Sequence, residues 1–315
     1  MKLDVVVPTY NRSGLLRAAI SSLLRAPVPA GLEVTIWVVD NNSKDDTESV
    51  VREIQSEAAL PCRYIKETNQ GLSHARNAGI RAGNGELIGF IDDDEEIDEN
   101  WYKVVACEFA GQETQFIGGA NLPNWAVPAP AWLPPANHAA IGVTAPLPRS
   151  PIGGESGVEL WGGNAVIRRS AFERVGLFSI RHGRTAKGLL ADEDRDLLER
   201  LLGADIHGMH VPDLIIYHHV PAERLTRHYH RRWRFWKGAS EGITGRTCSE
   251  PVVYMLGIPR YRIGKALRGL ASLPRDMFFT RDPRQAFADE LPWWSLLGYI
   301  YGKHFMRVDK YYDKQ

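Results

Sequence analysis

The sequence predicts an α/β protein with a mostly parallel sheet flanked by helices and a helical C-terminal extension. In the first hundred residues, apolar stretches typical of buried strands alternate with segments of helical periodicity. Strands that are apolar throughout and separated by helices are typical of a parallel sheet covered on both faces. Polar residues follow three of these strands, where such sheets bind ligands. After about residue 220 the chain becomes basic, aromatic and helical in pattern.

The N-terminal elements can be placed in order from their apolar spacing. LDVVVP and EVTIWVVD are continuous apolar runs, and the leucines and isoleucine between them recur at helical intervals. The expected strands are 3–8, 33–40, 62–67 and 86–92, and the expected helices are 12–25, 41–57 and 73–83.

The middle of the chain has a different character. Residues 121–152 contain eight prolines without readable periodicity, which predicts a long loop, and its tryptophans favour a docked loop over a free linker. A strand and a short helix are expected within 159–178, a further helix over 189–202, and a strand over 213–220.

Composition excludes several classes of protein. The 315 residues are 44% hydrophobic and 24% charged, as in ordinary globular proteins. The formal net charge of zero argues against a general nucleic-acid binder. Cys62, Cys107 and Cys248 form neither a disulfide framework nor a zinc pattern. Without an apolar run of about 18 residues or a signal peptide, a cytoplasmic protein without a membrane span is expected.

Five consecutive acids, Asp92 to Glu96, follow the fourth predicted strand. Carboxylates can hold Mg²⁺ or Mn²⁺, which bridges the oxygens of a diphosphate. The chain has neither a P-loop nor a G-x-G-x-x-G turn that would bind phosphate directly. The acids therefore predict a divalent cation with a nucleotide diphosphate. The alternative is an acidic helix N-terminus that includes Glu95, Glu96, Asp98 and Glu99.

Six short stretches of the sequence, taken in order, resemble a family 2 glycosyltransferase of the Rossmann-like GT-A fold. They are VVVPTYNR, VVDNNSKDDT, NQGLSHARNAGI, FIDDDEEI, GGNAVIRRSAFERVGLF and ADEDRDLLERL. The resemblance covers about residues 3–220. It implies an inverting transfer of a sugar from a nucleotide-diphosphate donor to an acceptor hydroxyl with a divalent metal. It also implies a catalytic domain over 1–220, with a nucleotide-binding half (1–100) and an acceptor-binding half (101–220), before a helical extension over 221–315.

The resemblance assigns donor-binding roles to the first strand ends. Asp92 is expected to face the ribose and Asp94 to bind the metal, although the third aspartate between them leaves the register open by one position. Asp40 is expected to accept a base N–H, or alternatively to cap the turn that follows it. The expected nucleotide-binding residues are Pro8, Thr9, Tyr10, Asn11, Asp40, Asn42, Arg76, Asp92 and Asp93.

The catalytic and acceptor residues are expected in the second half. Glu193 and Asp194 begin a helix, and the family pattern places the general base at Asp194, with Glu193 near the acceptor. His218 is expected to join Asp92 and Asp94 as a metal ligand because strand alternation turns His219 away. Trp161, Gly162, Gly163 and Asn164 are expected to bind the acceptor, although Trp161 also suits the core.

The segment 222–237 is basic and aromatic. It suits peripheral contact with the inner membrane face, where lipid-linked acceptors lie, or an internal helix whose arginines pair with acids; both interpretations stay open. The expected function is transfer from a UDP-sugar, with Mn²⁺ or Mg²⁺, to a carbohydrate or lipid-linked acceptor in polysaccharide or glycolipid synthesis. The alternatives are a sugar nucleotidyltransferase and a non-catalytic sugar-nucleotide-binding module.

Overall fold

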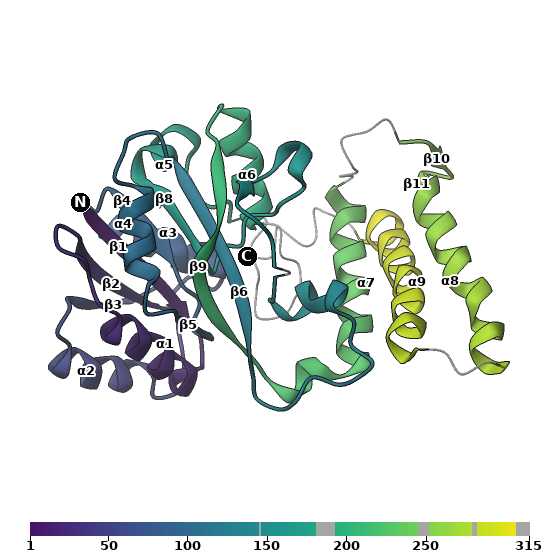
Figure 1. Cartoon of the computed structure of the whole chain (residues 1–315), viewed down its shortest axis with the longest axis horizontal. Helices are drawn as coiled ribbons and strands as arrows, with labels where there is room; N and C mark the ends of the chain where they lie inside the picture. Colours follow the sequence, from purple (N-terminus) through teal and green to yellow (C-terminus); the bar gives the residue numbers. More distant parts are fainter. Residues whose placement is uncertain (145, 181–192, 245–251, 279–281, 307–315) are drawn as a thin grey trace. The chain divides into compact units, whose positions relative to one another are not determined.

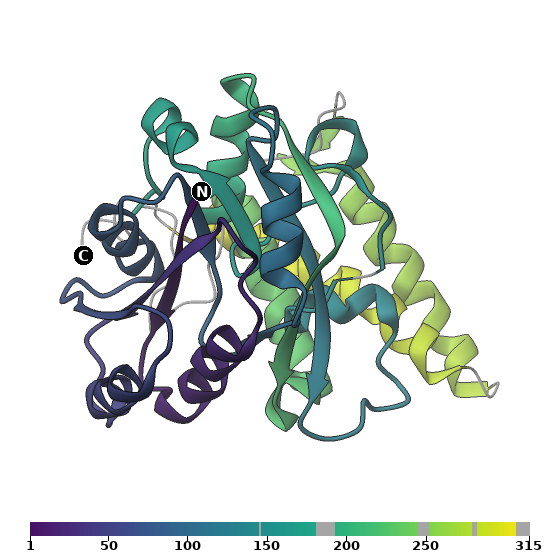
Figure 2. The ribbon, with the colours of Figure 1, turned by 60° about the vertical axis from the view of Figure 1, so that its left-hand side comes forward.

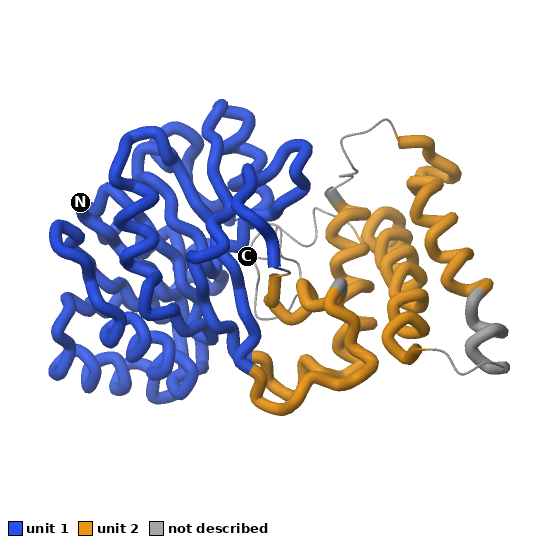
Figure 3. The backbone as a smooth tube through the Cα atoms, in the orientation of Figure 1, with its two compact units in different colours: residues 1–124, 146–188, 192–219 blue, residues 125–145, 189–191, 220–315 orange. Residues whose placement is uncertain are grey.

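The computed structural model describes residues 1–144, 146–180, 193–244, 252–278 and 282–306 (Figure 1). The chain folds into two compact units (Figure 3). Unit 1 comprises Met1–Asn124, Pro146–Gly188 and Asp192–His219. Unit 2 comprises Trp125–Ala145, Leu189–Ala191 and Val220–Gln315. The division near residue 220 lies where the composition changes, but residues 125–144 belong with the C-terminal helices instead of with the predicted catalytic domain.

Unit 1 is built on a mixed sheet with the strand order β3-β2-β1-β4-β8-β6-β9-β5, and β7 pairs with β9. The first four strands are parallel, as predicted. β8 is antiparallel to both β4 and β6, and β5 is antiparallel to β9. Its strands are β1 (Lys2–Thr9), β2 (Glu33–Asp40), β3 (Cys62–Lys66), β4 (Leu87–Phe90), β5 (Glu95–Ile97), β6 (Phe116–Trp125), β7 (Ser150–Pro151), β8 (Ala165–Arg168) and β9 (Gly208–Val220).

Helices cover both faces of this sheet, because the strand side chains alternate between two apolar clusters. Val5 and Val7 of β1 lie in one cluster, and Val6 lies in the other. The first cluster includes residues of α1 (Ser13–Arg25), α2 (Thr47–Glu57) and α4 (Trp101–Glu108). The second includes residues of α3 (Leu72–Ala82), α5 (Arg169–Val175) and α6 (Glu193–Gly203). Figure 2 shows these helices around the sheet from a second direction. The predicted α/β class and its order of elements are confirmed.

The proline-rich middle segment is more ordered than the predicted loop. It enters as the end of β6, continues through the 3₁₀ helix η1 (Pro135–Ile141), and reaches β7 and the 3₁₀ turn η2 (Gly154–Ser156). Leu133, Ile141 and Val143 form an apolar cluster with Val220 and Leu225. The prediction of a docked segment therefore fits, although periodicity could not reveal the strand.

Unit 2 is helical, with η3 (Ala222–Leu225), α7 (Arg227–Thr244), α8 (Arg260–Phe278) and α9 (Pro283–His304), and a small hairpin of β10 (Tyr254–Met255) and β11 (Ile258–Pro259). α7 and α9 approach closely through glycines. A Cβ atom on Gly238 would lie 2.2 Å from the Ser295 carbonyl oxygen, and one on Gly298 would lie 1.8 Å from that of Phe235. Among the described residues, no helix is both long enough and apolar enough to cross a bilayer.

The basic residues of α7 mostly make contacts within unit 2. Arg231 forms a two-point ion pair with Glu290 at 2.5 and 2.8 Å, and Arg234 donates to Asn137 Oδ1 at 2.8 Å. Arg227 lies over the Trp132 ring, 5.6 Å from its centre. These contacts favour the internal-helix interpretation of segment 222–237, with helices as its packing partners.

Candidate active site

The acidic run forms a tight turn at the carboxyl edge of the sheet. β4 ends at Phe90, and the chain reverses through Asp93 and Asp94 into β5. The Glu95 backbone N–H donates to the Asp92 carbonyl at 3.1 Å, and Glu95 Oε2 accepts from the Asp92 backbone N–H at 2.8 Å. Because Glu95 and Glu96 lie in a strand, the alternative of a helix N-terminus is wrong for these two acids.

Arg12, which directly follows the polar end of β1, binds two of the aspartates. Its Nη1 donates to Asp93 Oδ1 at 2.9 Å and to Asp94 Oδ2 at 3.1 Å. Thr9 Oγ1 also donates to Asp93, at 2.8 Å. The pKa of Asp93 is raised to about 6, mainly because the side chain is buried. The charge of Arg12 opposes this increase, and the charge of Asp94 adds to it. The aspartates that share a partner are therefore Asp93 and Asp94, not Asp92 and Asp94.

Arg76 of α3 links the acidic turn to the start of α6. Its guanidinium donates through Nη2 to Asp92 Oδ1 at 3.0 Å and through Nη1 to Asp194 Oδ1 at 2.8 Å. The Arg76 side chain is only 1% exposed, whereas those of Asp92 and Asp194 remain 31% and 28% exposed. Burial alone lowers the pKa of Arg76, but the charges of Asp194 and Asp92 raise it above its ordinary value. One buried cation thus positions two reachable carboxylates that are 102 residues apart in sequence.

Positions 162 and 163 require glycine because carboxylate groups lie directly against the backbone there. A Cβ atom on Gly162 would lie 2.2 Å from Asp194 Oδ1, and one on Gly163 would lie 2.4 Å from Glu95 Oε1. The Gly162 backbone N–H donates to Asp194 Oδ2 at 3.0 Å, so both oxygens of Asp194 are held. Burial raises the pKa of Glu95 well above its usual range, with the charges of Asp92 and Asp94 adding to the effect. The glycines admit carboxylates against the backbone, which differs from the flexible sugar platform expected from the sequence.

Two of the remaining predicted residues lie too deep for direct contact with an acceptor. Asn164 is fully buried: its Oδ1 accepts from Trp101 Nε1 at 3.0 Å, and its Nδ2 donates to the Leu214 carbonyl at 2.9 Å. Glu193 is 3% exposed. Asn164 therefore fastens neighbouring strands from within, and Asp194 is the accessible member of the acidic pair. Trp161 is half-buried.

His218 and Asp94 come together from β9 and the acidic turn. His218 Nε2 lies 3.6 Å from Asp94 Oδ2, and both side chains are buried. The backbone N–H of His219 donates to the Asp94 carbonyl at 2.8 Å. Within the described ranges, no group of three or more His, Cys, Asp or Glu side chains is arranged to hold a metal ion. The predicted ligand set of Asp92, Asp94 and His218 is not assembled, because Asp92 is directed to Arg76. Asp94 and His218 lie close enough together to serve as two ligands of one ion.

The predicted base-binding edge is formed by the ends of β1 and β2. Asp40 Oδ1 accepts from the Ser43 backbone N–H at 2.8 Å, and Oδ2 accepts from the Tyr64 hydroxyl at 2.7 Å. Asp40 thus caps the turn after β2, the alternative left open by the sequence, and contact with a base stays a prediction. Asn11 and Asn42 have positive φ angles of 52° and 66°.

The remaining predicted residues of this edge follow from β1. Pro8 and Thr9 are buried, whereas Tyr10 is 36% exposed at the end of the strand. Asn11 Oδ1 accepts from the Lys44 backbone N–H at 2.6 Å, which joins the two strand ends. The edge is therefore a connected set of turns with one accessible aromatic ring.

Sequence reasoning missed three residues of the site: Arg12, Asn41 and Glu95. Asn41 is buried and binds the Gly71 N–H and the Asn69 carbonyl, so that it fixes the start of α3. An arginine three residues after the end of a strand at the ligand-binding edge is a usable signal for Arg12. Nothing in a run of five acids shows that Glu95 is buried with Asp93 and Asp94, while Asp92 and Glu96 keep some exposure.

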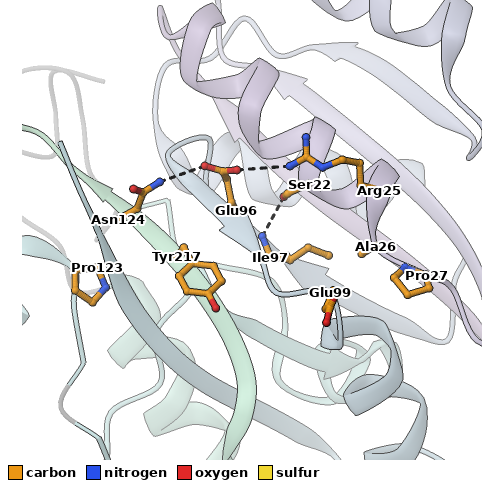
Figure 4. A pocket seen from close by; sticks show the side chains of 10 residues that line it. All are labelled: Ser22, Arg25, Ala26, Pro27, Glu96, Ile97, Glu99, Pro123, Asn124 and Tyr217. Atoms are coloured by element: carbon orange, nitrogen blue, oxygen red, sulfur yellow. Dashed lines mark hydrogen bonds and ion pairs between the residues drawn. The ribbon is translucent and has the colours of Figure 1, made fainter.

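A pocket of about 640 Å³ is lined in part by Glu96 and Ile97 of β5 and by Tyr217 of β9 (Figure 4). Strand alternation directs Glu95 and His218 to the turn, and Glu96 and Tyr217 to the pocket. None of the predicted site residues lines it. Its lining residues are Ser22, Arg25, Ala26, Pro27, Glu96, Ile97, Glu99, Pro123, Asn124 and Tyr217.

Comparison with known proteins agrees with this geometry. Residues 4–176 match the family model described as glycosyl transferase family 2. The chain is 37% identical over 97 residues to the GalNAc(5)-diNAcBac-PP-undecaprenol beta-1,3-glucosyltransferase of Campylobacter jejuni, a match that spans 30% of either protein. It is 23% identical over 245 residues to the succinoglycan biosynthesis protein ExoM of Rhizobium meliloti, which covers 77% of this chain and 74% of that one.

Two solved structures share the fold. The mannosyltransferase PcManGT from Pyrobaculum calidifontis, in complex with GDP-Man and Mn²⁺, superposes with a TM-score of 0.63 at 17% identity, over 97% of this chain and 88% of that one. Staphylococcus aureus TarS in complex with UDP gives a TM-score of 0.50 at 16% identity, over 100% of this chain and 92% of that one. Because the family model covers more than half of the residues, and the strand order and acidic turn lie where the family resemblance expects them, this chain belongs to glycosyl transferase family 2 and has the GT-A fold.

Proposed function

We propose that this chain transfers a sugar from a nucleotide-diphosphate donor, expected to be a UDP-sugar, to an acceptor hydroxyl with inversion at the anomeric carbon. The observation that carries the proposal is the Arg76 bridge between Asp92 and Asp194. The bridge holds two partly exposed carboxylates together, one in the acidic turn and one at the start of α6, which supports donor binding at the first and deprotonation of an acceptor at the second.

In this proposal Asp194 is the general base. The acceptor O–H gives its proton to the Asp194 carboxylate while its oxygen bonds to the anomeric carbon. The bond from that carbon to the diphosphate oxygen breaks, and the electron pair leaves with the diphosphate. Arg76 and the Gly162 N–H fix the orientation of the carboxylate. The exposure of Asp194 and the burial of Glu193 support the choice between these two acids.

A divalent cation, Mn²⁺ or Mg²⁺, would be held by Asp94 and His218. When bound, it would neutralise charge on the diphosphate. Arg12, which binds Asp93 and Asp94, would contact a phosphate oxygen of the same diphosphate. Asp92 would face the ribose, and Tyr10 and Asp40 would lie near the base. Trp161 is the remaining acceptor-binding candidate with exposed surface.

The acceptor is proposed to be a glycan or a lipid-linked saccharide. The named relatives support this class, since one acts on an undecaprenol-linked glycan and the other serves succinoglycan biosynthesis. The two nucleotides named in the neighbouring structures, GDP-Man and UDP, define the first donors to test.

The test measures release of UDP or GDP from a panel of nucleotide sugars by the wild type and by Asp194→Asn. We expect the variant to keep its nucleotide affinity and to lose turnover by about 10² or more, as is usual for a lost general base. Glu193→Gln is the matched control, and we expect it to lose less. Normal turnover by Asp194→Asn would contradict the assignment of the base. Transfer of a nucleotidyl group instead of a sugar would contradict the proposed reaction.

A further inference from the structure

A short hairpin in unit 2 exposes four large apolar side chains in a row. β10 and β11 pair through Met255 and Ile258, and the residues at their tip protrude. The exposed fractions are 65% for Val253, 46% for Tyr254, 49% for Met255 and 87% for Leu256. Single exposed apolar residues are ordinary, but a contiguous exposed group marks an interaction surface.

The backbone at the tip makes a leucine there unusual. Leu256 and Gly257 both have positive φ, 53° and 73°, in the two-residue turn that joins the strands. Such turns favour Asn, Asp or Gly at the first position, because the left-handed region is unfavourable for bulky side chains. A leucine that is both strained and exposed contributes little to folding, and strain of this kind is typical of functional positions.

The hairpin is nevertheless a fixed part of unit 2. The Arg260 backbone N–H donates to the Val253 carbonyl at 2.8 Å. Lys303 of α9 donates through Nζ to the Gly257 carbonyl, and the same Nζ lies 5.5 Å from the centre of the Tyr254 ring. The apolar tip is therefore presented by a defined structure.

The chain around the tip is strongly basic. Residues 252–271 contain four basic residues and no Asp or Glu. Arg262 is paired with Glu241 at 2.5 Å, whereas Arg260, Lys265 and Lys303 are exposed. Arg268, one turn further along α8, is exposed as well. An apolar tip beside exposed basic side chains matches a bilayer surface that offers hydrocarbon and anionic headgroups together. In a symmetric contact between two copies, the same positive surfaces would face each other.

We propose that the Val253–Leu256 tip and the exposed basic residues of α8 dock onto an anionic lipid bilayer. Leu256 enters the boundary of the hydrocarbon, while Arg260, Lys265 and Arg268 contact headgroup phosphates. The surface differs from segment 222–237, for which the sequence left both membrane contact and internal packing open, and whose arginines make contacts within unit 2. Docking does not depend on the proposed transfer reaction, since the assay below contains no nucleotide.

The test is co-sedimentation of the full chain with phosphatidylcholine vesicles that contain or lack phosphatidylglycerol. We expect binding to the anionic vesicles, which weakens as salt is raised. Leu256→Asn keeps a residue that tolerates positive φ, so the turn is retained. It should lower the vesicle affinity by about tenfold, the scale expected for loss of a buried leucine side chain. The triple change of Arg260, Lys265 and Arg268 to Gln should abolish the preference for anionic vesicles.

Ile180→Asn, at an apolar side chain in unit 1 that is 53% exposed, is the matched control and should bind vesicles as the wild type does. Equal binding by the wild type and Leu256→Asn would overturn the proposal, as would a wild type that ignores anionic vesicles. If Leu256→Asn dissociated an oligomer in sedimentation analysis and left vesicle binding unchanged, the tip would be a contact between copies instead.

Discussion

Replacement of Arg76 by Gln should destabilise unit 1 strongly, because it leaves three carboxylates, those of Asp92, Glu193 and Asp194, without their shared cation. Arg76 is 1% exposed and binds Asp92 at 3.0 Å and Asp194 at 2.8 Å. Its guanidinium also lies 5.3 Å from the centre of the Phe178 ring. Removing one partner of a buried ion pair costs roughly 3–5 kcal/mol. The two aspartates keep 31% and 28% exposure, so solvent screens part of their charge and the lower end, about 3 kcal/mol, is expected.

For a unit of this size, about 3 kcal/mol corresponds to a decrease in Tm of roughly 6–12 °C. The assay is thermal unfolding followed by circular dichroism, with Arg81→Gln as control, since Arg81 is an exposed arginine on the same helix. The double variant Arg76→Gln/Asp194→Asn should lose less stability than the two single losses added together, because the charge of Asp194 no longer stands uncompensated, although that of Asp92 does. If Arg76→Gln melted within about 2 °C of Arg81→Gln, the bridge would not be a structural centre of the site.

The remaining predictions concern unit 2. Gly298→Ala should lower the unfolding temperature of this unit, because the new Cβ would lie 1.8 Å from the Phe235 carbonyl oxygen. Gly264→Ala on α8 has only one side-chain atom within 4 Å of the new Cβ, at 3.9 Å, and should stabilise by up to about 1 kcal/mol; equal melting of both variants would contradict the close helix contact. Burial lowers the pKa of His230 to about 4, against about 6.5 in an unfolded chain, so the unfolded state takes up the proton first and stability is lost as pH falls through this range. Tryptophan fluorescence melts should show a loss of about 2 kcal/mol between pH 7 and pH 5 that His230→Phe removes, whereas the same change at the exposed His207 should leave the loss in place.

The sheet could be predicted because its causes are local. Val5, Val6 and Val7 are apolar in succession, and only a strand covered on both faces explains that pattern. The carboxyl ends of β1, β2 and β4 meet at one edge because these strands are parallel. Asp40, at the end of β2, and Asp92, just after β4, could therefore be predicted to lie at the same edge.

The pairing of charges within the site could not be predicted, because it depends on side chains far apart in sequence. Asp92 was expected to join Asp94 at a metal, but Arg76 of α3 holds it from one side, and Arg12 holds Asp93 and Asp94 from the other. The need for glycine at position 163 could not be predicted for the same reason. It is explained by the carboxylate of Glu95, which is distant in sequence and lies against the Gly163 backbone.

The contacts of the basic segment 222–237 could not be predicted either. Composition alone could not separate an exposed arginine from one that pairs inside a helical unit, as Arg231 does with Glu290. The exposed apolar tip at Leu256 was not predicted, since a four-residue apolar run is also typical of a buried strand.

The acidic turn is proposed to hold a nucleotide diphosphate with the help of a divalent cation, and calorimetric titration of UDP and GDP tests this proposal most directly. The measurement uses the wild type with Mn²⁺, the wild type with EDTA, and Asp94→Ala with Mn²⁺. Glu99→Ala, at an acid outside the turn, serves as control. We predict that at least one nucleotide binds with Mn²⁺, that EDTA and Asp94→Ala each remove most of the affinity, and that Glu99→Ala binds normally. Undiminished binding by Asp94→Ala, or binding of neither nucleotide under any condition, would contradict the account.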